Sequence, residues 1–297
     1  MRVLNFGSLN LDYVYAVEHF VRPGETLSAA SRVVKCGGKG LNQSIALARA
    51  GAEVCHAGCL GAGGEPLRQL LAGDGVDVSA LKEVDEMQGH TVIQVDPSGE
   101  NCILLYGGSN RCVTQAQIDD TLSRFGPGDW LVLQNEINGN AAIVNQAHAR
   151  GMRIALNPSP CNDALADVDF GKLTWLLVNE VEAEQLTGSS DPESAWRRLH
   201  ERWPNVSVLI TLGNAGSVAF RVEDGRIEIA RQAAFEVRAL DTTAAGDTYT
   251  GYFIAGRMAG LPLQACMRRA SRASAISVTR LGAADSIPFR AELEAAD

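Results

Sequence analysis

The sequence predicts an α/β protein, a three-layer α/β/α sandwich whose central sheet is doubly wound and mostly parallel, with a small β-sheet lid projecting from it. Two observations predict this fold. Short apolar, strand-like segments alternate with helical segments along most of the 297 residues, which is typical of a parallel sheet covered by helices on both faces. Two further regions break that rhythm with polar–apolar alternation, which indicates a second, smaller sheet.

The strand and helix segments follow one another in order along the chain. The first strand is expected in "RVLNFGSL", then a helix from about Gly40 to Ala50, a strand in "EVCHAGCLG" and a helix near Glu65 to Gly73. The later strand segments are "DWLVLQ", "MRIALNPS", "WLLVNE" and "VSVLITLG".

Two helix starts carry capping signals. Thr114 lies three residues before Gln117, the spacing of a capping box. The segment "SDPE" at residues 190–193 combines a capping residue, a proline suited to the first helical turn and an acid. Both positions are predicted to begin helices.

Residues 11–35 and 88–108 depart from the strand–helix rhythm. In the second region, "HTVIQVD" and "ENCILLY" are joined by the turn "DPSGE", which predicts a hairpin. We expect the two excursions to build one sheet that acts as a lid or an interface. No long Pro/Ser linker or internal repeat divides the chain, so we expect a single domain over residues 1–297 with this appendage.

Charge and composition narrow the range of partners. The formal net charge is −9 and no Lys/Arg cluster appears, which argues against nucleic acid as a partner. The apolar runs are far too short to span a bilayer, and the N-terminus enters a strand-like pattern without the features of a leader. We therefore expect no membrane partner and a cytoplasmic location. The seven scattered cysteines form no CxxC pair and are expected to be reduced thiols.

Polar residues follow several of the predicted strands. In a doubly wound sheet, ligands bind outside the carboxyl ends of the strands. The polar residues at those ends are Asn10, Asp12, Glu136, Asn157, Asn179, Glu182 and the segment Thr211 to Gly216. The sequence therefore predicts that they gather around one crevice.

Residues 36–43, "CGGKGLNQ", place three glycines and Lys39 ahead of a helix. The segment is not a P-loop, because Gly40 rather than Ser or Thr follows the lysine. Glycines let the backbone approach a polar ligand closely, and Asn42 can donate and accept hydrogen bonds from the first turn. A tight strand-to-helix turn with an exposed lysine explains the segment equally well on its own.

Residues 179–184, "NEVEAE", follow a strand and open an acidic helix. N-capping by Asn179, with acids favoured by the helix dipole, is an ordinary explanation. The alternative is that Asn179 and Glu182, three apart and on one face, organise water around Mg²⁺. The loop "TLGNAGS" at residues 211–217 is a weaker candidate, because glycine-bearing loops are common.

The segment "DTTAAGDTYTG" at residues 241–251 carries the sharpest signal. Small residues from Ala244 to Gly246 expose consecutive amides at the start of a helix, which predicts an anion hole. A cap is the ordinary explanation of Asp247 there, but residues 241–243 place further oxygens beside the hole. Phosphoryl transfer needs both features: amides and a metal steady the charge, and a carboxylate takes the proton of the attacking hydroxyl. Asp247 is then the base.

Together these segments resemble the ribokinase-like, or PfkB-type, carbohydrate kinases. The likeness runs nearly end to end in one order: "GSLNLD", "PGET", "GGKGLNQ", "LNPSP", "NEVEAEQLTG", "ITLGNAG", "DTTAAGDTYTG" and "VTRLGAADSIP". The resemblance implies ATP-dependent phosphorylation of the terminal hydroxyl of a small sugar, with ribose as the first expectation. It also implies Mg²⁺, a monovalent K⁺ activator, and a homodimer paired through the lid.

The resemblance further implies a role for each matching residue. The positions that match sugar-binding residues are Asn10, Asp12, Gly38, Lys39, Asn42 and Glu136. The positions that match nucleotide-binding residues are Asn179, Thr211, Gly213, Gly216 and Ser271, the last being smaller than in the family. Glu182 matches the acid tied to Mg²⁺ through water, the segment Ala244, Ala245 and Gly246 matches the anion hole, and Asp247 matches the catalytic base. The positions that match a monovalent-cation loop are Asp241, Thr243, Ser277, Arg280, Gly282 and Ser286.

Three alternatives stay open from the sequence. The first is a kinase for a fructose-type ketose or a nucleoside. Asn10, Asp12 and Asn42 favour a bare sugar, whereas Tyr13, Tyr15 and Tyr106 keep a nucleoside possible. The second is a non-catalytic sugar or nucleotide sensor, against which the intact Asp247 argues, because a binder needs no base. The third is an α/β scaffold or assembly protein without a ligand.

Overall fold

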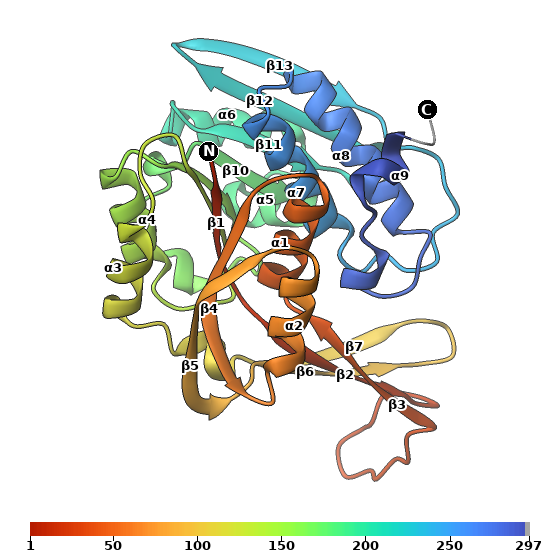
Figure 1. The fold of residues 1–297 in the computed structure, drawn as a ribbon. Helices are drawn as coiled ribbons and strands as arrows, with labels where there is room; N and C mark the ends of the chain where they lie inside the picture. The colour runs from red at the N-terminus through yellow and green to blue at the C-terminus, as the bar shows by residue number, and fades with distance from the viewer. Residues whose placement is uncertain (295–297) are drawn as a thin grey trace.

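The computed structural model describes residues 1–294 and contains a nine-stranded sheet between two helical layers, with a separate four-stranded sheet projecting from it (Figure 1). Neighbouring strands from β11 to β5 are parallel, whereas β12 and β13 add an antiparallel edge. In spatial order the strands are β13 (Arg226–Gln232), β12 (Ser217–Glu223), β11 (Ser207–Thr211), β10 (Trp175–Asn179), β9 (Arg153–Asn157), β8 (Trp130–Gln134), β1 (Val3–Phe6), β4 (Val54–Ala62) and β5 (Asp77–Met87). The predicted fold class is confirmed.

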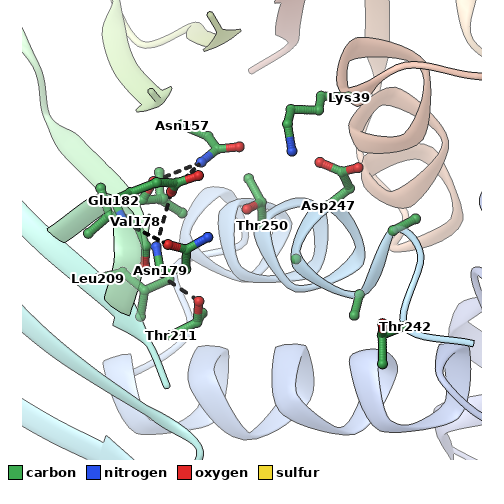
Figure 2. Close-up of a pocket in the computed structure, with 14 residues that line it drawn as sticks. Lys39, Asn157, Val178, Asn179, Glu182, Leu209, Thr211, Thr242, Asp247 and Thr250 are labelled. Carbon is green, nitrogen blue, oxygen red and sulfur yellow. Dashed lines mark hydrogen bonds between the residues drawn. The ribbon is translucent and has the colours of Figure 1, made fainter. Parts of the chain in front are cut away.

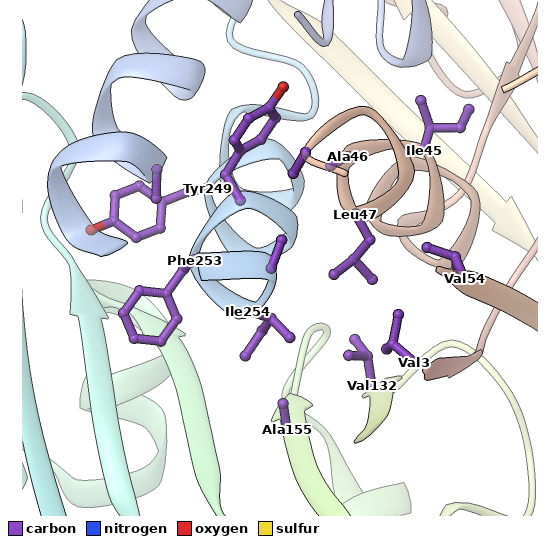
Figure 3. Close-up of a cluster of buried hydrophobic side chains, with 14 of the residues drawn as sticks. Val3, Ile45, Ala46, Leu47, Val54, Val132, Ala155, Tyr249, Phe253 and Ile254 are labelled. Atoms are coloured by element: carbon purple, nitrogen blue, oxygen red, sulfur yellow. The ribbon is translucent and has the colours of Figure 1, made fainter. Parts of the chain in front are cut away.

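Each face of the large sheet has its own apolar core, because successive residues of a strand point to opposite faces. Leu176 of β10 belongs to one core and the adjacent Leu177 to the other. Figure 3 shows the second of these cores, where Leu47 and Ile254 from two helices face Val132 of the sheet. Strands buried on both faces read as continuous apolar runs, which is why segments such as "WLLVN" signal this fold.

The helices divide between the two faces. On the face of Leu177 lie α1 (Lys39–Arg49), α2 (Glu65–Gly73), α7 (Ala245–Met258), α8 (Leu263–Ser277) and α9 (Arg290–Glu294). On the face of Leu176 lie α3 (Gln115–Ser123), α4 (Asn140–Ala149), α5 (Glu180–Thr187) and α6 (Pro192–Arg202). Short 3₁₀ turns are η1 (Gly108–Arg111), η2 (Asp163–Leu165), η3 (Phe170–Lys172), η4 (Gly213–Ala215) and η5 (Ala284–Ser286).

The predicted helix starts are confirmed. The Thr114 side chain accepts from the Gln117 amide at the start of α3, and Asp191 caps α6, which has Pro192 in its first turn. Across residues 1–294, no helix combines the length and apolar character needed to cross a membrane.

The four-stranded sheet, here called the lid, has the strand order β3-β2-β6-β7. Its strands are β2 (Asn10–Ala16), β3 (Ser31–Gly37), β6 (His90–Val95) and β7 (Asn101–Tyr106). The predicted hairpin is present as the antiparallel pair β6–β7. Because β2 begins four residues after β1 ends and β3 leads directly into α1, the lid joins the body where the carboxyl end of the sheet meets the first helix.

Candidate active site

A cavity of about 240 Å³ lies at the carboxyl ends of β9, β10 and β11, beside the N-termini of α1 and α7 (Figure 2). The lining includes many of the predicted site residues: Lys39, Asn179, Glu182, Thr211, Ala244, Ala245, Gly246 and Asp247. Figure 2 shows the Lys39 ammonium and the Asp247 carboxylate pointing toward one another, with Asn157, Asn179 and Glu182 on the opposite wall.

The start of α7 has the free amides and open space that the predicted anion hole requires. Ala244, the N-cap, has a left-handed backbone (φ 59°), which costs a residue with a Cβ roughly 1–2 kcal/mol. That turn leaves the amides of Gly246 and Asp247 without an acceptor among residues 1–294, while Ala245 N donates to Thr242 O at 3.2 Å. A Cβ on Gly246 would meet no atom within 4 Å, so the space beside these amides is open. Free amides at a helix N-terminus suit an anion.

The Asp247 carboxylate is buried, with 7% of the residue exposed, and two amide side chains hold it. Asn42 Nδ2 donates to Oδ2 at 3.0 Å, and Gln43 Nε2 donates to Oδ1 at 2.9 Å. Burial by itself lowers the pKa of the neighbouring Lys39 ammonium, but the carboxylates of Asp247, Glu136 and Glu182 outweigh it and raise that pKa. Lys39 is therefore a charged group at the centre of the site.

The residues that match sugar-binding positions surround the junction of β2 and α1. Glu136 Oε2 accepts from Ser8 Oγ at 2.5 Å and from the Lys39 amide at 3.0 Å. Asp12 Oδ1 accepts from Thr91 Oγ1 at 2.6 Å, and burial is the main cause that raises the pKa of Asp12.

Backbone proximity brings two more of these residues into the same group. Gly38 has φ 96°, and a Cβ there would lie 3.1 Å from the buried Asn10 amide nitrogen, so glycine is needed for this close approach. The six predicted sugar-site residues thus converge on one region.

A second cavity, of about 430 Å³, adjoins the first and shares Thr211, Thr242, Ala245 and Gly246 with it. Of the predicted nucleotide residues, Thr211, Gly213, Gly216 and Ser271 line this cavity, whereas Asn179 lines the first. The other side chains are largely apolar: Ala234, Phe235, Val237, Tyr249, Ala275 and Val278. An apolar chamber that opens onto a helix N-terminus suits a ligand with a planar base and phosphate groups.

Both explanations of "NEVEAE" have support in the structure. Glu182 N donates to Asn179 Oδ1 at 2.8 Å and Asn179 N donates to Glu182 Oε2 at 3.1 Å, which makes a capping box. Glu182 also lines the cavity and is 7% exposed. Within residues 1–294, no group of three or more His, Cys, Asp or Glu side chains is arranged to hold a metal. The Glu182 carboxylate, in a cavity that the Asp247 carboxylate also lines, fits Mg²⁺, which keeps several waters and binds phosphate oxygens.

The residues that match the cation loop are only partly brought together by side-chain bonds. Asp241 Oδ1 accepts from Thr243 Oγ1 at 2.6 Å, and Asp241 Oδ2 accepts from Gly282 N at 2.9 Å. These bonds outweigh the effect of burial, so the pKa of Asp241 lies below its usual value. The Ser277 and Ser286 hydroxyls bond within their own turns, to Ser274 O and Ala283 O.

The Arg280 side chain is turned toward a different element. Its guanidinium bonds the Glu292 carboxylate of α9 at 2.5 Å. Any cation ligand from Arg280 therefore comes from its backbone.

Sequence reasoning gave no role to Gln43, which is fully buried and contacts Asp247 directly. A signal was available: Lys39, Asn42 and Gln43 are spaced i, i+3 and i+4, so they share one face of α1. Ser8 was also missed, because nothing local marks a serine that bonds a glutamate 128 residues away.

The sequence and the fold have relatives among known proteins. A model of the pfkB family of carbohydrate kinases matches residues 2–290. The ribokinase of Haemophilus influenzae is 36% identical over 96% of this chain and 95% of that protein. The ribokinase of Cryptococcus neoformans var. grubii in complex with ADP has a TM-score of 0.85 and 33% identity, covering 100% of this chain and 99% of that chain. Arabidopsis thaliana ribokinase complexed with ribose and ATP has a TM-score of 0.85 and 27% identity, covering 99% and 97%.

The fold and these matches show the class of protein: an ATP-dependent kinase that phosphorylates a sugar. Within that class, the chain belongs to the pfkB family of carbohydrate kinases. The resemblance and the predicted ATP-dependent carbohydrate kinase are confirmed at this level.

Proposed function

We propose that this protein transfers the γ-phosphoryl group of ATP to the terminal hydroxyl of D-ribose, producing D-ribose 5-phosphate and ADP. One observation carries the proposal. The buried Asp247 carboxylate lies in the first turn of α7, beside free backbone amides and opposite the Lys39 ammonium. A base, an anion hole and a cation then meet where a hydroxyl and a phosphate can react.

In this proposal Asp247 is the general base. It accepts the proton of the sugar hydroxyl as that oxygen bonds to the γ-phosphorus and the bond from phosphorus to the bridging oxygen of ADP breaks. The Gly246 and Asp247 amides stabilise the charge on the transferring group, and Lys39 adds a positive charge on the same side. The burial of Asp247 keeps bulk water away from the proton transfer.

The second cavity is proposed to hold the nucleotide. Its apolar wall suits the adenine ring of ATP. Thr211, Gly213 and Gly216 are proposed to contact the ribose and phosphate groups of the nucleotide. Ser271 and Asn179 complete the proposed nucleotide set. Mg²⁺, when bound, would neutralise phosphate charge. Glu182, which lines the first cavity, is the residue proposed to orient it through water.

The proposed sugar site is the group Asn10, Asp12, Gly38, Lys39, Asn42 and Glu136. Its carboxylates and amides suit a ligand that carries many hydroxyl groups. Ribose is favoured because the similar proteins of Haemophilus influenzae and Cryptococcus neoformans are named ribokinases, and the Arabidopsis structure is a complex with ribose and ATP. A fructose-type ketose and a nucleoside are the alternatives.

A monovalent cation, K⁺ first, is proposed to bind beside the anion hole at the loop residues Asp241, Thr243, Ser277, Arg280, Gly282 and Ser286. The ionised Asp241 bridges the two segments that would supply backbone oxygens. We further propose a cytoplasmic protein that acts on small molecules, without a nucleic-acid or membrane partner.

A homodimer through the lid is also proposed. Leu104 of β7 is 72% exposed and stands in register with Val92 and Tyr13, on the face opposite Asp12. These three side chains make one apolar row across the lid, with Leu104 as its exposed end. A second copy of the chain would cover that row, because apolar surface exposed to water is unfavourable.

One assay tests the function: ADP release with Mg²⁺ and ATP, measured against ribose, fructose and a set of nucleosides. Ribose should give the highest kcat/KM. A higher value for fructose or a nucleoside would replace the substrate but keep the kinase. ATP binding by calorimetry without ADP release for any acceptor would instead support the sensor, and no ATP binding would support a scaffold.

A further inference from the structure

The side chain of Gln43 stands directly behind the proposed base and is fully buried. Its Nε2 donates to Asp247 Oδ1 at 2.9 Å and to Asn157 Oδ1 at 3.2 Å. A glutamine amide has two N–H donors, so both are used. Its Oε1 accepts from Gln134 Nε2 at 2.7 Å.

Neighbouring hydrogen bonds fix which end of Gln43 faces Asp247. Asn5 Nδ2 donates to the Gly40 carbonyl at 2.7 Å, and a carbonyl can only accept. The Asn5 Oδ1 therefore accepts from Gln134 Nε2, at 2.9 Å, and the same Gln134 nitrogen donates to Gln43 Oε1. The direction of donation passes along the chain of amides, so Gln43 presents N–H and never a carbonyl to Asp247.

The other neighbour of Gln43 gives the same answer independently. Asn157 Nδ2 donates to the Leu177 carbonyl at 3.0 Å, which turns Asn157 Oδ1 toward Gln43 as an acceptor. The same Asn157 Nδ2 lies 3.5 Å from Glu182 Oε2. Gln43 and Asn157 therefore connect the proposed base on α7 with the acid on α5 through one line of hydrogen bonds.

We propose that Gln43 is a positioning residue that holds the Asp247 carboxylate in the orientation required to accept the sugar proton, with its donor direction set by Gln134 and Asn5. This inference rests on the proposed role of Asp247. Gln43 itself stays away from the substrate, because its three hydrogen bonds all go to protein groups. Small displacements of a base reduce turnover strongly, while substrate affinity depends on other contacts.

The charged groups around Asp247 set the background for a pH experiment. The Lys39 ammonium of α1 faces Asp247, and Glu136 and Glu182 act on the same ammonium from the end of β8 and from α5. The Gln43→Met change leaves all of these charges in place. A change in the pH profile then reports the lost hydrogen bond to the carboxylate.

The experiment compares Gln43→Met with Gln117→Met, a matched control. Gln117 is also buried and also bonded through both ends of its amide, to Gly58 O and Cys59 Sγ, but it lies on α3 away from the cleft. We expect Gln43→Met to lower kcat ~10- to 100-fold with a much smaller change in the KM for sugar. The acid side of its kcat–pH profile should move to higher pH, because a donor to the ionised carboxylate is lost. Gln117→Met should leave both kcat and the kcat–pH profile unchanged.

A double-mutant cycle completes the test. In the Asp247→Asn background, Gln43→Met should have almost no further effect on kcat, since the group it positions is no longer a base. An unchanged pH profile, a rise in KM alone, or full additivity with Asp247→Asn would overturn the inference while leaving the proposed base intact. Near-normal turnover of Asp247→Asn itself would instead overturn the proposed function.

A second variant keeps the inference testable if Gln43→Met fails to fold. Gln134→Met removes the donor to Gln43 Oε1 and leaves Gln43 and Asp247 in the chain. We expect a smaller fall in kcat and the same direction of movement of the acid side. Turnover and a pH profile equal to those of the unaltered protein would count against the donor chain.

Discussion

The body of the protein and its lid depart from the usual distribution of polar and apolar residues in opposite ways. Beneath Asp247, at the junction of β1, β4, β8 and α1, five polar side chains are buried. We call this the polar cluster: Asn5, Gln43, Ser44, His56 and Gln134, each with less than 2% of the residue exposed. On the lid, Leu104 and Ile103 of β7 are 72% and 57% exposed.

The two regions differ in how they treat groups in an unfavourable environment: buried polar groups in the body and exposed apolar groups on the lid. The members of the polar cluster are joined by internal hydrogen bonds, such as Ser44 Oγ with His56 Nδ1 at 2.7 Å and with Asn5 Nδ2 at 2.8 Å, although His56 Nε2 and Gln134 Oε1 have no partner among the described residues. Buried networks of this kind hold a single geometry, which suits a reaction centre. The lid leaves apolar side chains exposed to water, which is typical of a surface that another molecule covers. The body holds its polar groups in place, whereas the lid exposes apolar surface that the proposed dimer would cover.

The largest effect is expected from the body, at Asp247. Asp247→Asn keeps the shape of the side chain and removes the base, so kcat should fall roughly 10²- to 10⁴-fold, while sugar affinity changes much less. Steady-state kinetics and sugar titration measure the two effects. Asp224→Asn, in the exposed turn between β12 and β13, is the matched control and should keep normal turnover. Near-normal turnover in Asp247→Asn would contradict the proposed role of Asp247 as the base, and with it the assignment of catalysis to the body of the protein.

The next largest effect is expected on the free energy of unfolding, when His56 in the polar cluster is protonated at low pH. Burial lowers the pKa of His56 to about 4 from an ordinary 6.5. As the pH falls, His56 is therefore protonated near pH 6.5 in the unfolded chain but only near pH 4 in the folded chain. The contribution to stability is complete above pH 6.5 and is lost as the pH falls to about 4, amounting to roughly 3 kcal/mol.

Denaturant unfolding at a series of pH values checks this expectation. His56→Asn should flatten the fall in the free energy of unfolding between pH 6.5 and pH 4. His148→Asn, on the exposed side of α4, should leave the fall unchanged. Equal pH dependence in His56→Asn and the unaltered protein would show that the cluster tolerates charge.

The lid comes next. Leu104→Lys places a charge in the exposed apolar row, which should weaken dimer formation by about 30-fold or more, the effect of losing an interface anchor of about 2 kcal/mol. Sedimentation at several protein concentrations measures it. Ile227→Lys, at an exposed apolar position on the edge strand β13, is the control and should leave assembly unaltered. A chain that is monomeric before any substitution would contradict the proposed dimer.

The smallest effect is expected at the cation loop, which belongs to the body but borders solvent. Turnover should be higher in K⁺ than in Na⁺ or in a buffer without monovalent metal. Asp241→Asn should reduce that difference, since the ionised Asp241 joins the two loop segments. A flat response to K⁺ in the unaltered protein would remove the cation proposal without touching Asp247.

The sequence alone determined what depends on neighbours along the chain. The apolar runs of a doubly covered sheet, the β6–β7 hairpin, the capping residues Thr114 and Asp191, and the small residues before Asp247 are local patterns with local physical causes. The family likeness rests on the same segments in order, and family membership is confirmed over residues 2–290.

Only the tertiary structure decided how those segments meet. Asn42 and Gln43 lie 205 and 204 residues before the Asp247 carboxylate that they hold, and no periodicity in the sequence encodes such a contact. The left-handed backbone of Ala244 was equally hidden, because alanine carries no local signal for that conformation. The direction of the amide hydrogen bonds behind Asp247 follows from which backbone carbonyls stand at the ends of the network. That is a property of packed elements, since the groups come together only when β1, β8, β9, β10, α1 and α7 are assembled.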